Sequence, residues 1–277
     1  MTAAGMPSGP ARPEAPAAHY PRADLPTTGL TRRQVVAETW LVLGVSLGAS
    51  AIWAMLRIIE RLTRAVALNQ QTASLNNSVT PDRPWLDLSY QLTGIVLGVL
   101  PAFLALHLLR RDDAAALRAI GWDRRHPAGD LLRGLGLTAL IGIPGLGLYL
   151  AARALNLNAT IAAANLTENW WAIPVLVLAA AQNAILEEVV MVGYLLTRWQ
   201  QAGWPVWRAI GVSAVIRGGY HLYQGFGGFV GNLVMGLIFG YLYTRTRRVK
   251  PLVIAHTLLD VIAFVGYTLL RDRVGWL

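Results

Sequence analysis

The sequence has no cysteine and a single lysine, Lys250. The absence of cysteine excludes disulfide bonds, thiol catalysis and thiolate metal sites. Charged residues are also scarce, since they make up 14% of the chain, against roughly 25% in an ordinary soluble domain. This composition argues against a soluble protein.

Hydrophobic residues make up 55% of the 277 positions and gather in long blocks. Blocks of about 20 apolar residues are typical of membrane-spanning helices. Seven such blocks lie near 35–57, 90–109, 131–152, 171–197, 207–224, 227–244 and 250–270. Pro144 and several glycines favour a kink or a break in the third block. An eighth helix is expected if residues 59–75 or 113–122 lie on the membrane surface. We therefore predict an all-α, polytopic membrane helix bundle with about seven to eight transmembrane helices.

The chain divides into three predicted segments. Residues 1–30 are rich in proline and alanine, which is typical of a disordered tail, and they lack the pattern of a signal peptide. Residues 31–160 hold the first three apolar blocks and a basic loop, and residues 161–277 hold the other four.

Arginine supplies nearly all of the net charge of +9. Cytoplasmic loops of membrane proteins are enriched in basic residues. Basic residues lie here in the loops 110–133, 198–208 and 245–250, whereas 154–170 and 225–231 have none. This alternation predicts a cytoplasmic N-terminus and argues against nucleic acid as a partner. One group of arginines conflicts with the rule, because it would lie outside: Arg57, Arg61, Arg64 and Arg83.

Ionisable residues interrupt the apolar blocks of the second half, and such residues mark function by default. Glu187 and Glu188 lie near the middle of the fourth block, with Asn183 one helical turn earlier. Each of two later blocks carries a pair with i, i+4 spacing, which places both members on one helix face. The remaining residues of this set are Arg217 and His221, Asn232, and His256 and Asp260. A single buried His or Glu is often only a contact between helices, but pairs on three helices favour a functional cluster.

These motifs resemble those of the CPBP family of intramembrane proteases, which is related to the CAAX-processing enzymes and is also called the ABI family. The similar stretches are "EEVVMVGYLL", "RGGYHLYQG", "NLVMGLIFGYLY" and "HTLLD", within residues 170–270. The family typically shows Glu-Glu-x-x-x-Arg, then Phe-x-x-x-His, then His-x-x-x-Asn or Asp. The resemblance implies that residues 161–277 form a catalytic transmembrane core.

The resemblance also implies roles for individual residues. Glu187 matches the acid that activates the attacking water, and Glu188 matches its partner. His221, His256 and Asp260 match residues that orient the water or stabilise the oxyanion. Asn232 is a further candidate, because a tight glycine-rich turn would bring it back toward His221. A metal-free mechanism and a zinc site both remain open, with Glu187, His221 and His256 as candidate ligands.

The chain departs from the family pattern at two positions. Val192 stands where the first motif has Arg, and Arg217 stands where the second has Phe. We predict that the cation has moved from the fourth apolar block to the fifth, and that Arg217 reaches the two glutamates from the facing helix.

The expected function is therefore an intramembrane endopeptidase acting on a membrane-anchored peptide or protein, with membrane lipids as further partners. The preferred mechanism needs no cofactor, and zinc is the alternative. Two alternatives remain: a catalytically inactive scaffold or immunity-like member of the same fold, and a proton-coupled carrier, for which no internal repeat is found. The arginine- and alanine-rich composition indicates a bacterial plasma membrane. The oligomeric state stays open.

Overall fold

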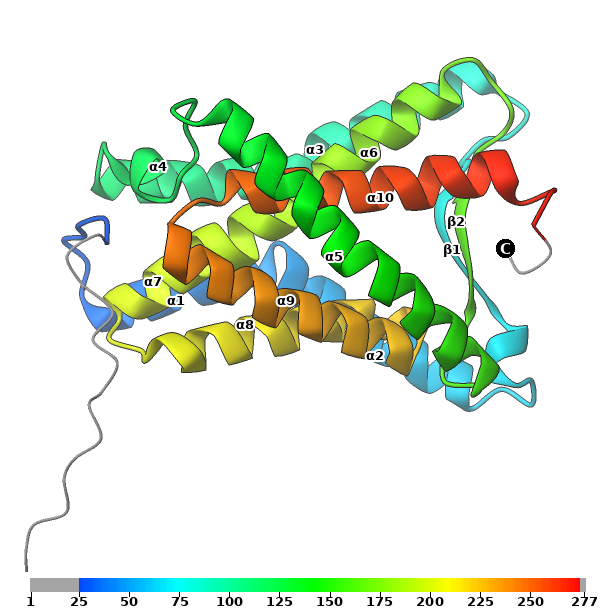
Figure 1. Ribbon diagram of the computed structural model, residues 1–277, viewed down its shortest axis with the longest axis horizontal. Coiled ribbons are helices and arrows are strands. Elements are labelled where there is room, and N and C mark those ends of the chain that lie inside the picture. Colours follow the sequence, from blue (N-terminus) through cyan, green and yellow to red (C-terminus); the bar gives the residue numbers. More distant parts are fainter. Residues whose placement is uncertain (1–24, 275–277) are drawn as a thin grey trace, which may run out of the picture.

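The structure, a computed structural model, describes residues 25–274. They form a helical bundle, as predicted (Figure 1). The helices are α1 (Arg32–Gly44), α2 (Leu47–Leu62), α3 (Pro84–Asp112), α4 (Ala116–Ala119), α5 (Pro127–Ala154), α6 (Ala172–Glu187), α7 (Leu195–Gln201), α8 (Val206–His221), α9 (Phe226–Thr246) and α10 (Lys250–Leu270). A π-helical segment, Glu188–Tyr194, joins α6 to α7.

Each predicted apolar block forms helix, but the number of spans differs from the expectation. Within residues 25–274, five helices are long and apolar enough to cross a membrane, or six if α1 and α2 form one span bent by 52°. The count of seven to eight is not confirmed, because α8 has only 16 residues, fewer than the roughly 20 of a typical span. Pro144 lies inside a continuous α5, so this block is not broken.

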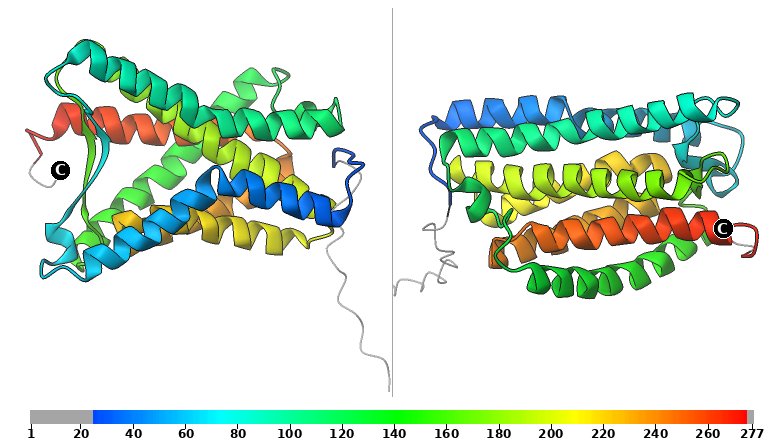
Figure 2. Two further views of the ribbon diagram at one scale, coloured as in Figure 1. Left: turned by 180° about the vertical axis from the view of Figure 1, so that it is seen from behind. Right: turned by 90° about the horizontal axis from the view of Figure 1, so that it is seen from above.

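The helices pack in layers. Seen from above, α1 to α3 lie along one face, α5 lies along the opposite face, and α6 runs between them (Figure 2). Helix α5 packs on α10, α3 packs on α6, and α2 packs on α8. Helices from the predicted segments 31–160 and 161–277 are therefore interleaved around a shared core.

Helices α8 and α9 approach each other closely at two glycines. A Cβ atom on Gly236 would lie 3.0 Å from the Cα of Ala214, and one on Gly240 would lie 2.9 Å from a side-chain carbon of Ile210. Small residues four apart allow helix backbones to approach in membranes, so these glycines let α9 pack directly on α8.

A two-stranded parallel sheet, which the sequence analysis did not predict, lies at one end of the bundle (Figure 1). Strand β1 (Thr72–Asn77) follows α2, and β2 (Thr160–Asn165) follows α5. Thr72 lies opposite Thr160 in the register. Because β1 precedes α3 and β2 precedes α6, the sheet holds together the ends of four helices.

The basic loops gather at the other end of the bundle (Figure 1). Arg248, which precedes α10, forms ion pairs with Asp130 (2.6 Å) and Asp123 (3.3 Å). Burial raises the pKa of the Asp123 carboxyl, but hydrogen bonds from Arg125 and Arg248 outweigh it and hold that pKa below its usual value. These contacts join the start of α5 and the loop before it to the loop before α10.

Most of the predicted disordered tail, 1–30, lies outside the described residues. Residues 25–30 lie against the basic end of the bundle: Thr28 donates a hydrogen bond to Asp112 (2.9 Å), and the Pro26 carbonyl accepts one from Gln201 (2.7 Å). The chain immediately before α1 is therefore attached to the ends of α3 and α7.

Two of the four arginines that conflict with the positive-inside rule have partners close by on the sheet side. Arg61 donates to the Thr72 carbonyl (3.1 Å), and Arg64 pairs with Glu60. Arg57 lines a cavity described below. Arg61 thus binds the sheet and Arg57 lines the cavity, which gives a physical reason for these two basic residues at this end.

Candidate active site

The two adjacent glutamates lie where the backbone hydrogen bonding changes from α-helical to π-helical. Glu187 ends α6, and Glu188 begins the π-helical segment. Short π-helical stretches occur mostly inside α-helices and frequently at functional sites. Glu188 is fully buried at 0% exposure, and Glu187 is 8% exposed.

Neighbouring hydroxyl groups satisfy backbone carbonyls of the π-helical segment. Ser213 on α8 donates to the Met191 carbonyl (2.7 Å), and Thr197 donates to the Gly193 carbonyl (2.7 Å). Polar backbone groups inside a membrane need partners within the protein, so these hydroxyls stabilise the segment that carries Glu188.

Arg217 lies between the two glutamates, as predicted from the two departures from the family pattern. Its Nη2 is 2.6 Å from Oε1 of Glu188 and 3.3 Å from Oε2 of Glu187. The side chain is 1% exposed, so it does not reach the membrane surface. A buried guanidinium beside buried carboxylates offsets their charge.

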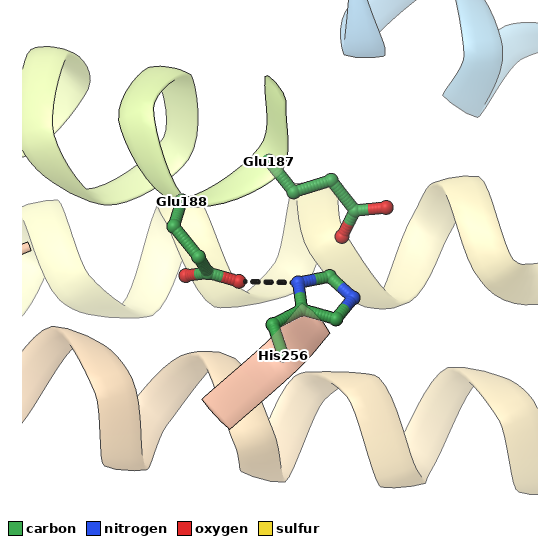
Figure 3. Close-up of side chains that lie close together, drawn as sticks. All are labelled: Glu187, Glu188 and His256. Atoms are coloured by element: carbon green, nitrogen blue, oxygen red, sulfur yellow. Dashed lines mark hydrogen bonds and ion pairs between the residues drawn. The ribbon is translucent and has the colours of Figure 1, made fainter. Parts of the chain in front are cut away.

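His256 completes the cluster from α10 (Figure 3). Its Nδ1 is 2.7 Å from Oε1 of Glu188 and 3.2 Å from Nη2 of Arg217. Its Nε2 is 3.7 Å from Asp260, one turn further along α10. Each ring nitrogen of His256 therefore faces a carboxylate.

The cluster opens into a cavity of about 740 Å³ on the side of the sheet. The predicted site residues that line it are Glu187, His221, His256 and Asp260. Glu188 and Arg217 do not line it and lie behind Glu187. The geometry thus separates residues that a ligand in the cavity can touch from residues that act through Glu187.

His221 and Asn232 differ in their relation to the cluster. His221 lines the cavity, and its Nδ1 lies 3.1 Å from the Arg217 carbonyl on its own helix. Because a carbonyl only accepts, that nitrogen carries the ring proton, and Nε2 of the neutral ring is an acceptor. Asn232 is not brought to the cluster; its amide donates to the Gly228 carbonyl on its own helix (3.1 Å).

Tyr220 is a site residue that the sequence analysis missed. Its hydroxyl donates to Oε2 of Glu187 (2.7 Å), and it also lines the cavity. The hydroxyl and Arg217 therefore share one oxygen of Glu187. Its position next to His221, three residues after Arg217, was the only indication of this contact in the sequence.

The predicted zinc ligands do not form the observed group. Among the described residues, the side chains close enough to share an ion are Glu187, Glu188 and His256, without His221. Nη2 of Arg217 contacts one side-chain atom of each of these three residues. A cation already lies where their donor atoms converge, so this arrangement does not fit a metal ion there.

The fold and the site together define an integral membrane protein with a cluster of acids, histidines and an arginine inside its helix bundle. Comparison with protein families gives a match over residues 169–262 to the family described as type II CAAX prenyl endopeptidase Rce1-like. This match confirms the predicted resemblance to the CPBP family over the region that holds every residue of the cluster. Comparisons with curated proteins and with solved structures give no match.

Proposed function

We propose that the protein is an intramembrane endopeptidase that hydrolyses a peptide bond of a membrane-associated protein or peptide. One observation carries this proposal: Glu187 lines the cavity together with two histidines, while Arg217 from behind the cavity wall and Tyr220 within it both contact the Glu187 carboxylate. The match to a family of proteases over residues 169–262 supports the same reaction class.

Glu187 acts as the general base. A water molecule in the cavity donates a proton to the free oxygen of Glu187, and the resulting hydroxide attacks the carbonyl carbon of the scissile peptide. The tetrahedral intermediate then expels the amine, which takes the proton back from Glu187. The Tyr220 hydroxyl and Arg217 both contact Oε2, which leaves Oε1 for the water.

The histidines have different roles. Nε2 of neutral His221 accepts a hydrogen bond and orients the attacking water. His256 faces Glu188 at Nδ1 and Asp260 at Nε2, so it can keep a proton on both nitrogens and donate from Nε2 to the developing oxyanion. Glu188 and Arg217 are positioning residues, because both lie behind the cavity wall.

This mechanism needs no metal ion. The contacts of Arg217 with all three members of the candidate ligand group support that reading. The guanidinium supplies the positive charge that a metal would bring to the acids, and Glu187 supplies the base.

The apolar helices indicate a protein of the membrane itself. We place it in a bacterial plasma membrane with a cytoplasmic N-terminus, since the basic loops and the start of α1 lie at the same end of the bundle. The cavity then opens toward the opposite, extracytoplasmic half.

The test is cleavage of a library of membrane-anchored fluorogenic peptides by purified protein in lipid. Wild-type protein should cleave a subset of the library, and Glu187→Ala should lose that activity. Glu168→Ala is the matched control, since Glu168 precedes the same helix with its side chain 92% exposed; it should keep wild-type activity.

Absence of cleavage by the wild type across the library would contradict the proposal and favour the catalytically inactive scaffold. Proton uptake coupled to solute transport, without cleavage, would favour the carrier.

A further inference from the structure

A strand forms one wall of the cavity beside Glu187. Ser74, Leu75 and Asn76 of β1 line it together with the site residues. Strand β1 pairs with β2 along one edge only, in a sheet of two strands. The other edge of β1 therefore has backbone groups that β2 does not bind.

The register shows which backbone groups point to the unpaired edge. The Thr160 N–H of β2 donates to the Gln71 carbonyl (2.9 Å), just before β1. Successive residues of a strand point their backbone groups to opposite edges. The Thr72 carbonyl, accordingly, faces away from β2 and accepts from Arg61 (3.1 Å). Ser74 lies two residues further, so its N–H and C=O share the direction of Thr72.

A side chain already binds the first residue of this edge, since Arg61 donates to the Thr72 carbonyl. Beyond it, the part of β1 that lines the cavity is Ser74–Asn76. The strand is held rigidly there, because Ala73 is 1% exposed and packs against Ile58 and Leu68.

An exposed strand edge is a template for another extended chain. A membrane-embedded substrate must leave its helical conformation to reach Glu187, and its freed backbone groups then need partners that lipid does not offer. A strand edge in the wall of the same cavity supplies such partners. The cavity volume of about 740 Å³ lies in the range of sites that hold small ligands or short peptide segments.

We propose that β1 is the substrate-docking edge: the segment beside the scissile bond binds in extended form along Ser74–Asn76 and hydrogen-bonds to the backbone of Ser74. This inference rests on the proposed peptidase function and names how its substrate binds. Recognition through main-chain groups makes the site tolerant of substrate sequence and selective for segments that can unwind.

The first arm of the test changes one backbone donor. Ser74→Pro removes an N–H on the edge of β1 that β2 does not bind, and proline is tolerated in an edge strand at such a position. Ser74→Ala is the matched control, because it keeps the backbone. With a peptide that wild-type protein cleaves, Ser74→Pro should raise KM and lower kcat/KM by about three- to tenfold, the effect of one hydrogen bond. Ser74→Ala should lose less than Ser74→Pro, because its backbone N–H is still present.

The second arm leaves the protein unchanged and scans the peptide with N-methyl groups, outside the two residues of the scissile bond. Strand pairing uses the N–H groups of alternate residues. Cleavage by wild-type protein should therefore fall at every second position and stay near the unmodified rate at the positions between. Ser74→Pro should keep the alternating pattern at a lower overall rate, because proline removes the N–H of residue 74 and keeps its carbonyl.

The outcomes separate the two proposals. Cleavage without the alternating pattern, or with equal effects of Ser74→Pro and Ser74→Ala, overturns docking on β1 and leaves the peptidase intact. If Ser74→Pro lowers the melting temperature, the scan with wild-type protein decides. If wild-type protein cleaves no peptide, the proposed function fails and the docking edge fails with it.

Discussion

Replacement of Arg217 by methionine removes the cation at the centre of the cluster. Arg217 is 1% exposed and lies 2.6 Å from Glu188 and 3.3 Å from Glu187. Methionine has a similar length and no charge, so Arg217→Met leaves both carboxylates without their counter-ion and changes the packing little.

The magnitude follows from burial and distance. Breaking a buried ion pair by removing one partner costs about 3–5 kcal/mol, because the other charge stays buried. Two unit charges 3.3 Å apart attract by roughly 5 kcal/mol at an effective dielectric constant of about 20. The loss of even half of this interaction between Arg217 and ionised Glu187 corresponds to a decrease in kcat/KM of about 60-fold.

The assay measures cleavage and thermal unfolding of the same lipid-reconstituted samples. Arg208→Met is the control, since Arg208 lies on the same helix and stacks on Trp204 (4.4 Å to the ring centroid) outside the site. Arg217→Met should lose at least about fiftyfold in kcat/KM and unfold at a lower temperature. Adding Glu188→Gln to Arg217→Met should restore part of the stability without restoring activity, because one of the two unpaired charges is then gone.

A swap tests whether the cation has moved between helices. Arg217→Phe restores the family residue in the second motif, and Val192→Arg restores the arginine of the first. The kcat/KM of the double variant should be at least about tenfold higher than that of Arg217→Phe, a difference of about 1.4 kcal/mol. Wild-type activity in Arg217→Met or Arg217→Phe would refute the reasoning, since Glu187 would then need no neighbouring cation.

Three further predictions concern groups around the cluster. Tyr220→Phe removes the hydroxyl that donates to Glu187, and we expect kcat/KM to fall by about tenfold or more in the cleavage assay with little change in melting temperature. Ser213→Ala leaves the Met191 carbonyl without its donor and should lower the free energy of unfolding by about 1–2 kcal/mol, while peptide turnover per folded molecule is unchanged. Arg198→Met removes a fully buried guanidinium from two carboxylates; denaturation should show a loss of about 3–5 kcal/mol, and a stability equal to wild type would contradict it.

The sequence predicts those parts of the fold that depend on hydrophobic length and helical spacing. Each apolar block forms helix, and the spacing of Arg217 with His221 and of His256 with Asp260 places three of these four side chains in or beside the cavity wall that holds Glu187. Arg217 was found through a departure from a family motif rather than through a pattern of its own.

Three features escaped prediction for physical reasons. The sheet pairs short strands that are distant in sequence, Thr72 with Thr160, and "TASLNN" and "TIAAAN" lack the bulky β-branched pattern of a confident strand. The π-helical segment Glu188–Tyr194 differs from an α-helix in its backbone hydrogen bonds and not in its apolar composition, so hydrophobic periodicity does not reveal it. The predicted count of seven to eight spans is not confirmed, because a hydropathy block does not show where a helix ends, as at the bend after α1 and in the 16-residue α8.

The most direct test of the central claim is the cleavage rate of metal-stripped protein in lipid, measured in chelator for the wild type, Glu187→Gln and Glu168→Gln. We predict that the wild type and Glu168→Gln keep their rates, and that Glu187→Gln loses at least about a thousandfold, or ~4 kcal/mol. Loss of the wild-type rate in chelator with recovery on adding zinc, or an undiminished rate in Glu187→Gln, would contradict a metal-free peptidase with Glu187 as its base.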